Sequence, residues 1–130
     1  MAIISWNLAI QASGQAPISV STNPQPVEAI DRVVVTLEPG DSDKLIEIQP
    51  GGATAIALMA ITSDRYGAAF SFKASDGSSD SAPITLDAPQ IYSNGSVALF
   101  GLDPMQLKLS NTSSDQTAAV EIFVARDATP

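Results

Sequence analysis

Apolar and polar residues alternate with a period of two along most of this chain, and short clusters of Gly, Pro, Asn, Asp and Ser separate the alternating segments. Since successive side chains of a β-strand point to opposite faces, this pattern predicts strands that each bury one face. We therefore expect an all-β domain, an antiparallel β-sandwich or jelly roll of about nine or ten strands with no amphipathic helix.

The first alternating segment covers residues 3–10. Its apolar side chains at even positions share one face of the expected strand, whereas Ser5 and Asn7 point to the other face. Such a stripe fits either the core of the chain, where we place Trp6, or an anchor on another subunit, where tryptophan is enriched. The candidate subunit interface consists of Ile3, Ile4, Trp6, Leu8 and Ile10.

A proline-containing stretch follows the next short segment, residues 17–21. Residues 22–26 contain two prolines, and because proline lacks the backbone donor of a central strand, we interpret this stretch as a linker or edge segment. We divide the chain into residues 1–26, an N-terminal strand or arm with its linker, and residues 27–130, the β-sandwich domain. Residues 1–21 form either an arm that packs on a neighbouring subunit or an ordinary first hairpin of the same sandwich.

The middle of the chain contains further expected strands. Residues 32–38 and 44–48 each precede a turn rich in Pro and Gly, which preset the dihedral angles of turns. Residues 54–62 are apolar on both faces, and we favour a buried strand over a helix because the run is short and has no polar face. Residues 66–73 and 83–87 are expected to form two more strands.

Two hairpins are predicted in the C-terminal part. Asn94-Gly95 lies between the apolar segments 90–93 and 96–100. Asn-Gly is typical of a type I′ turn, because both central residues of that turn need positive φ. Residues 105–110 and 118–125 alternate in the same way, and a polar loop joins them, so we expect them to pair as a second hairpin.

The side chains available for chemistry narrow the possible functions. The chain contains neither His nor Cys, which removes the usual acid–base group near neutral pH, thiolate metal sites and disulfides. The loop from Asp76 to Asp80, and the pair Asp41 and Asp43, contain oxygen ligands of the kind that Ca²⁺ prefers. Clusters of this type between strands are more often solvated turns. We therefore assign no catalytic, cofactor-binding or metal-binding residue.

Charge and hydropathy limit the possible partners. The net charge is −8, and the six basic residues are dispersed singly along the sequence at Arg32, Lys44, Arg65, Lys73, Lys108 and Arg126. Because no stretch can neutralise a row of phosphates, we do not expect direct binding to nucleic acid. The longest apolar run, residues 55–61, is far shorter than the ~20 residues that cross a bilayer, and no secretory signal is evident. We expect synthesis in the cytoplasm and no membrane partner.

One part of the sequence resembles a known class of protein. Residues 107–115 (LKLSNTSSD) followed by residues 120–124 (VEIFV) are similar to the closing strands of small β-sandwich virion proteins of tailed bacteriophages. The absence of cysteine, the acidity and the abundance of Ala, Ser and Thr have the same character. The resemblance covers about 20 residues.

The resemblance implies a capsid cement or decoration protein. Such a protein typically forms a homotrimer on the exterior of the virion and contacts the major capsid protein at several points, so that weak contacts add up to strong avidity. The N-terminal stripe would then be a subunit or capsid interface. Two other functions remain open: a ligand- or carbohydrate-binding module that uses Trp6, Tyr66 or Tyr92, and a tail or fibre component of a virion. A small hydrolase with paired carboxylates ranks last.

Overall fold

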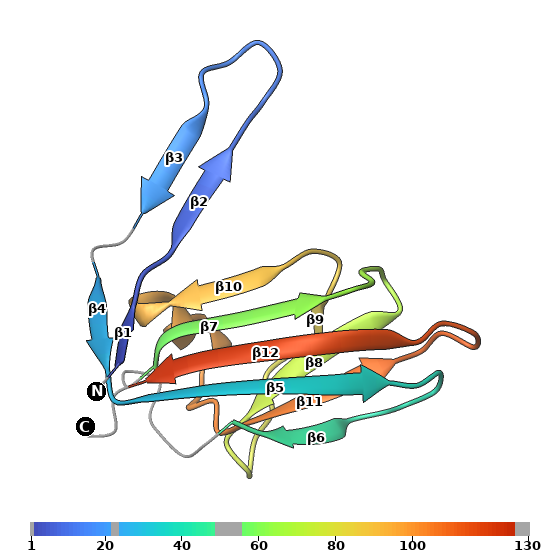
Figure 1. Cartoon of the computed structure of the whole chain (residues 1–130). Helices are drawn as coiled ribbons and strands as arrows, with labels where there is room; N and C mark the ends of the chain where they lie inside the picture. The colour runs from blue at the N-terminus through green and yellow to red at the C-terminus, as the bar shows by residue number, and fades with distance from the viewer. Residues whose placement is uncertain (1, 22–23, 49–55, 127–130) are drawn as a thin grey trace.

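The chain forms a sandwich of two four-stranded antiparallel sheets, from which a narrow ribbon projects at one corner (Figure 1). The computed structural model describes residues 2–21, 24–48 and 56–126. The expected all-β sandwich is confirmed. Among the described residues there are twelve strands rather than nine or ten, because the N-terminal segments divide into shorter pieces.

Each sheet mixes strands that are distant in the sequence. The first sheet has the order β10 (Gln90–Ser93), β7 (Ile56–Ser63), β12 (Ala118–Arg126) and β5 (Ala29–Leu37). The second has the order β6 (Lys44–Glu47), β11 (Gln106–Asn111), β8 (Phe70–Ser75) and β9 (Ile84–Thr85). Two small ribbons complete the structure: β1 (Ala2–Ile4) with β4 (Gln25–Val27), and β2 (Asn7–Ile10) with β3 (Ile18–Ser21).

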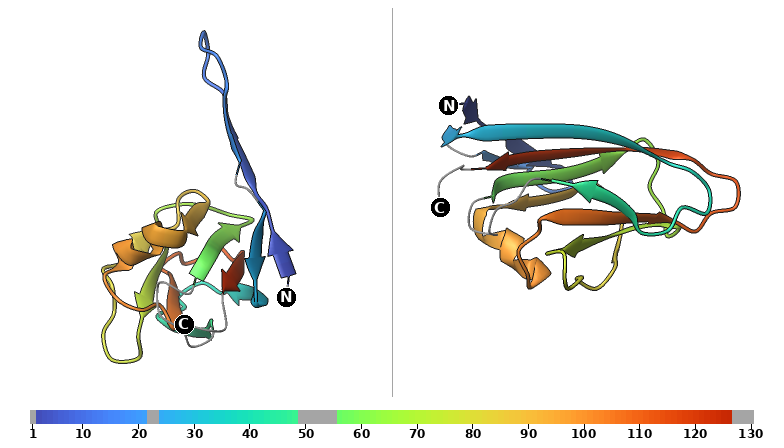
Figure 2. Two further views of the ribbon diagram at one scale, coloured as in Figure 1. Left: turned by 90° about the vertical axis from the view of Figure 1, so that its left-hand side faces the viewer. Right: turned by 90° about the horizontal axis from the view of Figure 1, so that it is seen from below.

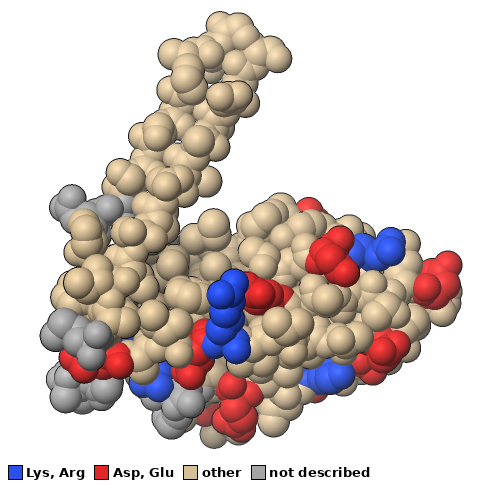
Figure 3. Space-filling model, in the orientation of Figure 1, with Lys and Arg blue, Asp and Glu red and all other residues tan. Residues whose placement is uncertain are grey.

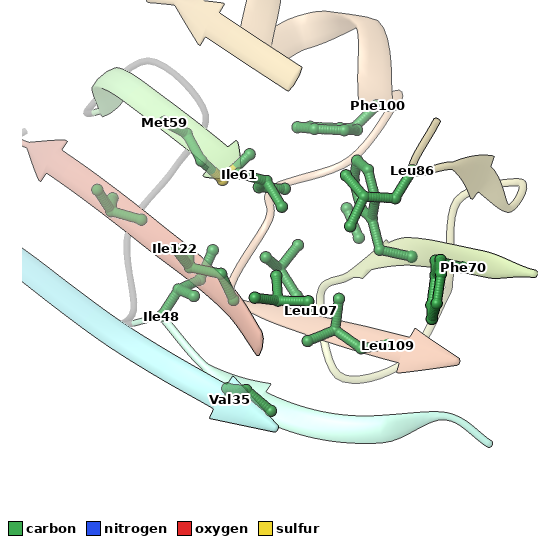
Figure 4. Close-up of a cluster of buried hydrophobic side chains, with 14 of the residues drawn as sticks. Val35, Ile48, Met59, Ile61, Phe70, Leu86, Phe100, Leu107, Leu109 and Ile122 are labelled. Atoms are coloured by element: carbon green, nitrogen blue, oxygen red, sulfur yellow. The ribbon is translucent and has the colours of Figure 1, made fainter. Parts of the chain in front are cut away.

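The core lies between the two sheets and consists of alternate residues from their inner faces (Figure 4). In β12 the residues Val120, Ile122 and Val124 are buried, and the side chains between them are only partly so. Leu107 and Leu109 of β11 approach them from the second sheet and are fully buried. Burying a side chain of this size stabilises the fold by ~2 kcal/mol, so this interior is the main source of stability.

The apolar segment 54–62 was correctly predicted to be a buried strand. Residues 56–63 form β7, which lies between β10 and β12 in the first sheet. Both of its faces are apolar because Met59 and Ile61 on one face are buried in the main core, and Leu58 on the other face is buried in a second, smaller core. Residues 54 and 55 lie outside the described residues.

The hairpin predicted at Asn94-Gly95 is wrong. Residues 94–100 form a 3₁₀ helix, η2 (Asn94–Phe100), and β10 pairs with β7 instead. At the start of η2 the Ser93 N–H donates to the Ser96 hydroxyl oxygen at 2.8 Å. The Ser96 hydroxyl in turn donates to the Ser93 carbonyl oxygen at 3.0 Å. Val97 and Phe100, three residues apart, are both buried in the core. No helical turn was predicted anywhere in the chain. It forms here because a 3₁₀ helix has three residues per turn, so Val97 and Phe100 lie on the same side and both reach the core.

The predicted C-terminal hairpin is also wrong. The two strands alternate as expected, but β11 pairs with β6 and β8, whereas β12 pairs with β5 and β7. The connecting loop therefore crosses from one sheet to the other. The residues that carry the resemblance to virion proteins lie in this crossing.

Asn111 fixes that crossing. Its side chain is completely buried, and its amide nitrogen donates to the Gln116 carbonyl oxygen at 2.7 Å and to the Leu37 carbonyl oxygen at 3.4 Å. Its amide oxygen accepts from the Ser113 N–H at 3.0 Å. One side chain thus joins β11, the loop and β5 of the opposite sheet, and its polar atoms are paired as buried polar atoms must be.

Candidate functional site

The most distinctive feature of the molecule is the ribbon of β2 and β3, which stands away from the sandwich (Figure 2). Every residue from Asn7 to Ser21 is exposed. We call residues 7–21 the arm. Its turn contains Gly14, whose φ of 76° is a conformation that glycine adopts without steric cost.

The arm is attached to the body by a small second core. Ile4 of β1 and Val27 of β4 are buried together with Leu58 and Ala125, which belong to the outer face of the first sheet. The predicted single strand over residues 3–10 is therefore two strands, interrupted at Ser5 and Trp6. The interruption is where the chain leaves the body and becomes the arm.

One face of the arm is apolar. The register places Leu8 opposite Val20 and Ile10 opposite Ile18, and directly opposed residues lie on the same face of a two-stranded ribbon. These four side chains are 42–56% exposed. The residues between them are Asn7, Ala9, Ser19 and Ser21, so the other face is polar or small.

A groove lies at the base of this apolar face. It has a volume of about 320 Å³ and lies between the start of the arm and the outer face of strands β7 and β10. Its lining residues are Trp6, Asn7, Leu8, Leu58, Ala60, Ile91 and Ser93. Ile91 pairs with Ala60 across the two strands and is 52% exposed. Leu8 belongs both to this groove and to the apolar face of the arm, so the two surfaces are continuous.

Neither surface carries a charge. The first charged residue of the chain is Glu28, and the space-filling view shows the arm without acidic or basic atoms (Figure 3). The charged residues belong to the body, where several form exposed ion pairs such as Arg32 with Glu121 at 3.0 Å and Lys108 with Asp80 at 2.9 Å. The arm and groove are thus an uncharged region on a molecule of net charge −8.

The five residues of the predicted interface lie in different environments. Ile4 is buried within the chain, in the second core. Trp6 is half-buried against the second core and lines the groove, Ile3 is 69% exposed, and Leu8 and Ile10 lie on the apolar face of the arm.

The other half of this site was not predicted from the sequence. Ile18 and Val20 complete the apolar face, and Ile91 forms the opposite wall of the groove. The alternation of Ile18 and Val20 was a signal that they share a face, but only the pairing of β2 with β3 shows that they continue the stripe of Leu8 and Ile10.

The acidic loops use their carboxylates within the chain. The carboxylate of Asp76 accepts the N–H groups of Ser78 and Ser79 at 2.8 and 2.6 Å, and these bonds lower its pKa below 3.8. The hydrogen bond from Lys108 lowers the pKa of Asp80 in the same way. Asp41 accepts the N–H of Glu38. In the ranges that the structure describes, no group of three or more acidic side chains is placed to hold a metal ion.

The aromatic residues considered for a sugar-binding surface do not form one. Tyr66 and Tyr92 are partly buried and pack against the main core, whereas Trp6 packs against the second core. Tyr92 lies on Phe100 with the ring centroids 4.6 Å apart, and burial raises its pKa above 10.0.

No helix within residues 2–21, 24–48 and 56–126 is long and apolar enough to cross a membrane. No protein-family model, curated protein or solved structure matches this chain.

Proposed function

We propose that this chain is a structural, non-enzymatic assembly protein that docks on other protein surfaces through its arm. The observation that carries the proposal is the apolar face of Leu8, Ile10, Ile18 and Val20, which is exposed on an uncharged ribbon held away from the body. Contiguous exposed apolar surface on a protein is typical of a protein–protein contact. An isolated two-stranded ribbon is only marginally stable in water, so covering its apolar face with another protein would stabilise it.

The energetics favour a weak contact that is repeated. Full burial of each side chain is worth ~1.5–3 kcal/mol, and about half of each is exposed, so covering all four contributes ~3–6 kcal/mol before the costs of association. A single arm therefore binds in the millimolar range or weaker. Several arms that engage together convert this into strong binding, because each later contact is intramolecular.

We propose that the specific role is that of a decoration or cement protein on the exterior of a tailed-phage head, with the major capsid protein as partner. The resemblance of residues 107–115 and 120–124 to virion proteins supports this role. The net charge of −8 supports it as well, because it disfavours contact with packaged DNA.

The proposal implies that a tailed phage encodes the chain, and the test is cosedimentation with mature heads of that phage prepared without this protein. Ile10→Thr with Ile18→Thr removes apolar area from the arm while keeping β-branched side chains that favour strands. The control, Ala9→Thr with Ser19→Thr, places the same two residues on the opposite face. Wild type and control are expected to bind heads, and the first variant is expected to lose binding. The proposal is overturned if wild type does not bind, or if both variants bind equally well.

A further inference from the structure

We infer that the groove receives one large apolar side chain of the docking partner, such as leucine or phenylalanine, and that this side chain anchors the partner beside the arm. The inference rests on the proposed function and deepens it, because it names the chemical group that the docking surface recognises. The arm supplies a broad and weak contact, and the groove next to it supplies a specific one.

The groove exists because a small residue lies in the middle of the sheet. The register places Ala60 of β7 between Ile91 of β10 and Phe123 of β12 on the outer face of the first sheet. The methyl group of Ala60 is much shorter than the side chains on either side, so the surface dips at β7. Leu58, two residues away on the same face, is buried in the second core, which holds the floor of the groove in place. The hollow is therefore formed before any partner binds.

The volume of the groove fits one side chain. A cavity of ~150 Å³ lined by aliphatic and aromatic side chains holds a benzene ring. The groove has a volume of about 320 Å³. A leucine or phenylalanine side chain fills such a space together with the main chain at its mouth. A two-stranded ribbon with four large side chains is too bulky to enter, so the occupant is not the arm of another copy.

The lining suits an uncharged side chain and its flanking main chain. Trp6, Leu8 and Ile91 supply apolar surface around the floor. Asn7 at the start of the arm and Ser93 at the end of β10 supply an amide and a hydroxyl, which can bind the N–H and C=O groups next to an anchor side chain. A charged side chain would lose its hydration there without meeting an opposite charge. The groove therefore selects a large apolar group.

Continuity with the arm assigns the anchor to the docking partner. Leu8 belongs both to the groove and to the apolar face of the arm. A protein that covers this face therefore passes over the mouth of the groove. A side chain that fills the hollow removes apolar lining from water, and burial of one such side chain strengthens binding about 10- to 100-fold. Buried anchors of this kind, often in contact with tryptophan, carry most of the affinity of protein–protein contacts.

The fluorescence of Trp6 tests the groove directly, because Trp6 lines it and is the only tryptophan of the chain. The probe is N-acetyl-leucinamide, and its control is N-acetyl-alaninamide, which differs only in the side chain. The leucine probe is expected to change the fluorescence with saturation at millimolar to tens of millimolar concentration, and the alanine probe is expected to have no effect.

Two variants locate the response. Ala60→Leu fills the hollow and is expected to abolish it. Ala119→Leu, the same substitution elsewhere on the outer face of the sheet, is expected to keep it. The inference is overturned if wild type gives no response, if both probes act equally, or if the response survives in Ala60→Leu.

Binding to heads connects the groove to the proposed function. Ala60→Leu removes the hollow and Ile91→Thr removes one wall, and each is expected to weaken binding to heads about 10- to 100-fold. Ile91 is 52% exposed, so its replacement leaves the fold intact. The matched control, Ile30→Thr, changes an exposed isoleucine of β5, at the opposite edge of the same sheet, and is expected to bind like wild type. Equal binding by these variants and wild type overturns the anchor and leaves the proposed function standing. A wild type that binds the leucine probe but ignores heads supports the anchor and overturns the role on the capsid.

Discussion

Replacement of Asn111 by Asp is the sharpest test of how the two sheets are held together. The change is nearly isosteric, and one carboxylate oxygen can still accept from the Ser113 N–H. The other oxygen replaces the amide nitrogen that donates to the carbonyl oxygens of Gln116 and Leu37. An ionised carboxylate would lose both donated hydrogen bonds and place a charge against two acceptors in a site that water does not reach.

The magnitude follows from protonation. A carboxyl group in this position stays protonated in the folded state, because burial and the two carbonyl groups raise its pKa, while in the unfolded chain its pKa is ~3.9. The protonated group can still donate to Gln116, so the loss at low pH is ~1 kcal/mol for the remaining bond. At pH 7 the unfolded chain is ionised, and holding the proton in the folded state lowers stability by up to ~4 kcal/mol more. This follows from 1.36 kcal/mol for each of the about three pH units between pH 7 and the unfolded pKa of ~3.9. The total is ~5 kcal/mol.

The sign of the pH dependence is fixed by linkage. Above pH ~3.9 the unfolded Asn111→Asp variant releases its proton and the folded variant keeps it, so the folded state binds more protons and stability falls as pH rises. The destabilisation relative to wild type is therefore expected to be small near pH 4 and large near pH 7. Urea unfolding followed by circular dichroism at both pH values measures it. Asn7→Asp, the same substitution at an exposed position, is expected to change stability by less than ~0.5 kcal/mol at either pH. A destabilisation by Asn111→Asp that does not vary with pH would refute this reasoning.

Two further predictions concern η2 and the exposed ion pairs. Val97→Ala is expected to lower the free energy of unfolding in urea by ~2 kcal/mol because Val97 is fully buried. Leu99→Ala is expected to lower it by less than ~0.5 kcal/mol because Leu99 is 80% exposed. Equal losses would instead fit a strand with both residues on one face. The hydrogen bond from Lys108 lowers the pKa of Asp80 in the folded protein. The ionised Asp80 carboxylate therefore stabilises the fold fully above pH 3.8, and this stabilisation is lost as pH falls through the lowered pKa. Asp80→Asn is thus expected to lower the urea midpoint at neutral pH and to match wild type in strong acid, and an equal difference at both would contradict the assignment.

Sequence patterns predicted the strands better than their partners. Period-two alternation located β5, β11 and β12 because each buries one face against the core, and a short run that is apolar on both faces located β7. Which strands pair with each other is much harder to deduce from the sequence pattern. Alternation in β11 and β12 is the same whether the two strands pair or face each other across the core, so the crossing between sheets could not be predicted from it.

The Asn-Gly prediction failed for a related reason. A type I′ turn requires positive φ at both residues, but Asn-Gly only permits it. Val97 and Phe100 are three residues apart and bury both side chains when the segment is helical, while a strand would direct them to opposite faces. Tertiary burial therefore outweighed the local turn preference.

Only half of the candidate site was predicted from the sequence. Leu8 and Ile10 stood out as a stripe, yet exposure of a stripe cannot be derived from the stripe itself, because a core-facing strand has the same pattern. In the structure the stripe changes from buried to exposed at Trp6. Ile4, before it, is buried, whereas Leu8 and Ile10, after it, are exposed.

The arm and the body differ in what stabilises them. Ordering each residue costs ~1–2 kcal/mol of backbone entropy, and the sandwich recovers this cost through a core in which most inward side chains are fully buried. The arm has no such core, since residues 7–21 are all exposed, and an isolated two-stranded ribbon is marginal in water. Its order must therefore increase when its apolar face is covered by another chain. If the arm docks on another chain as we propose, ordering of the arm and that contact are linked equilibria, and the stability of the arm, unlike that of the body, depends on the concentration of the partner.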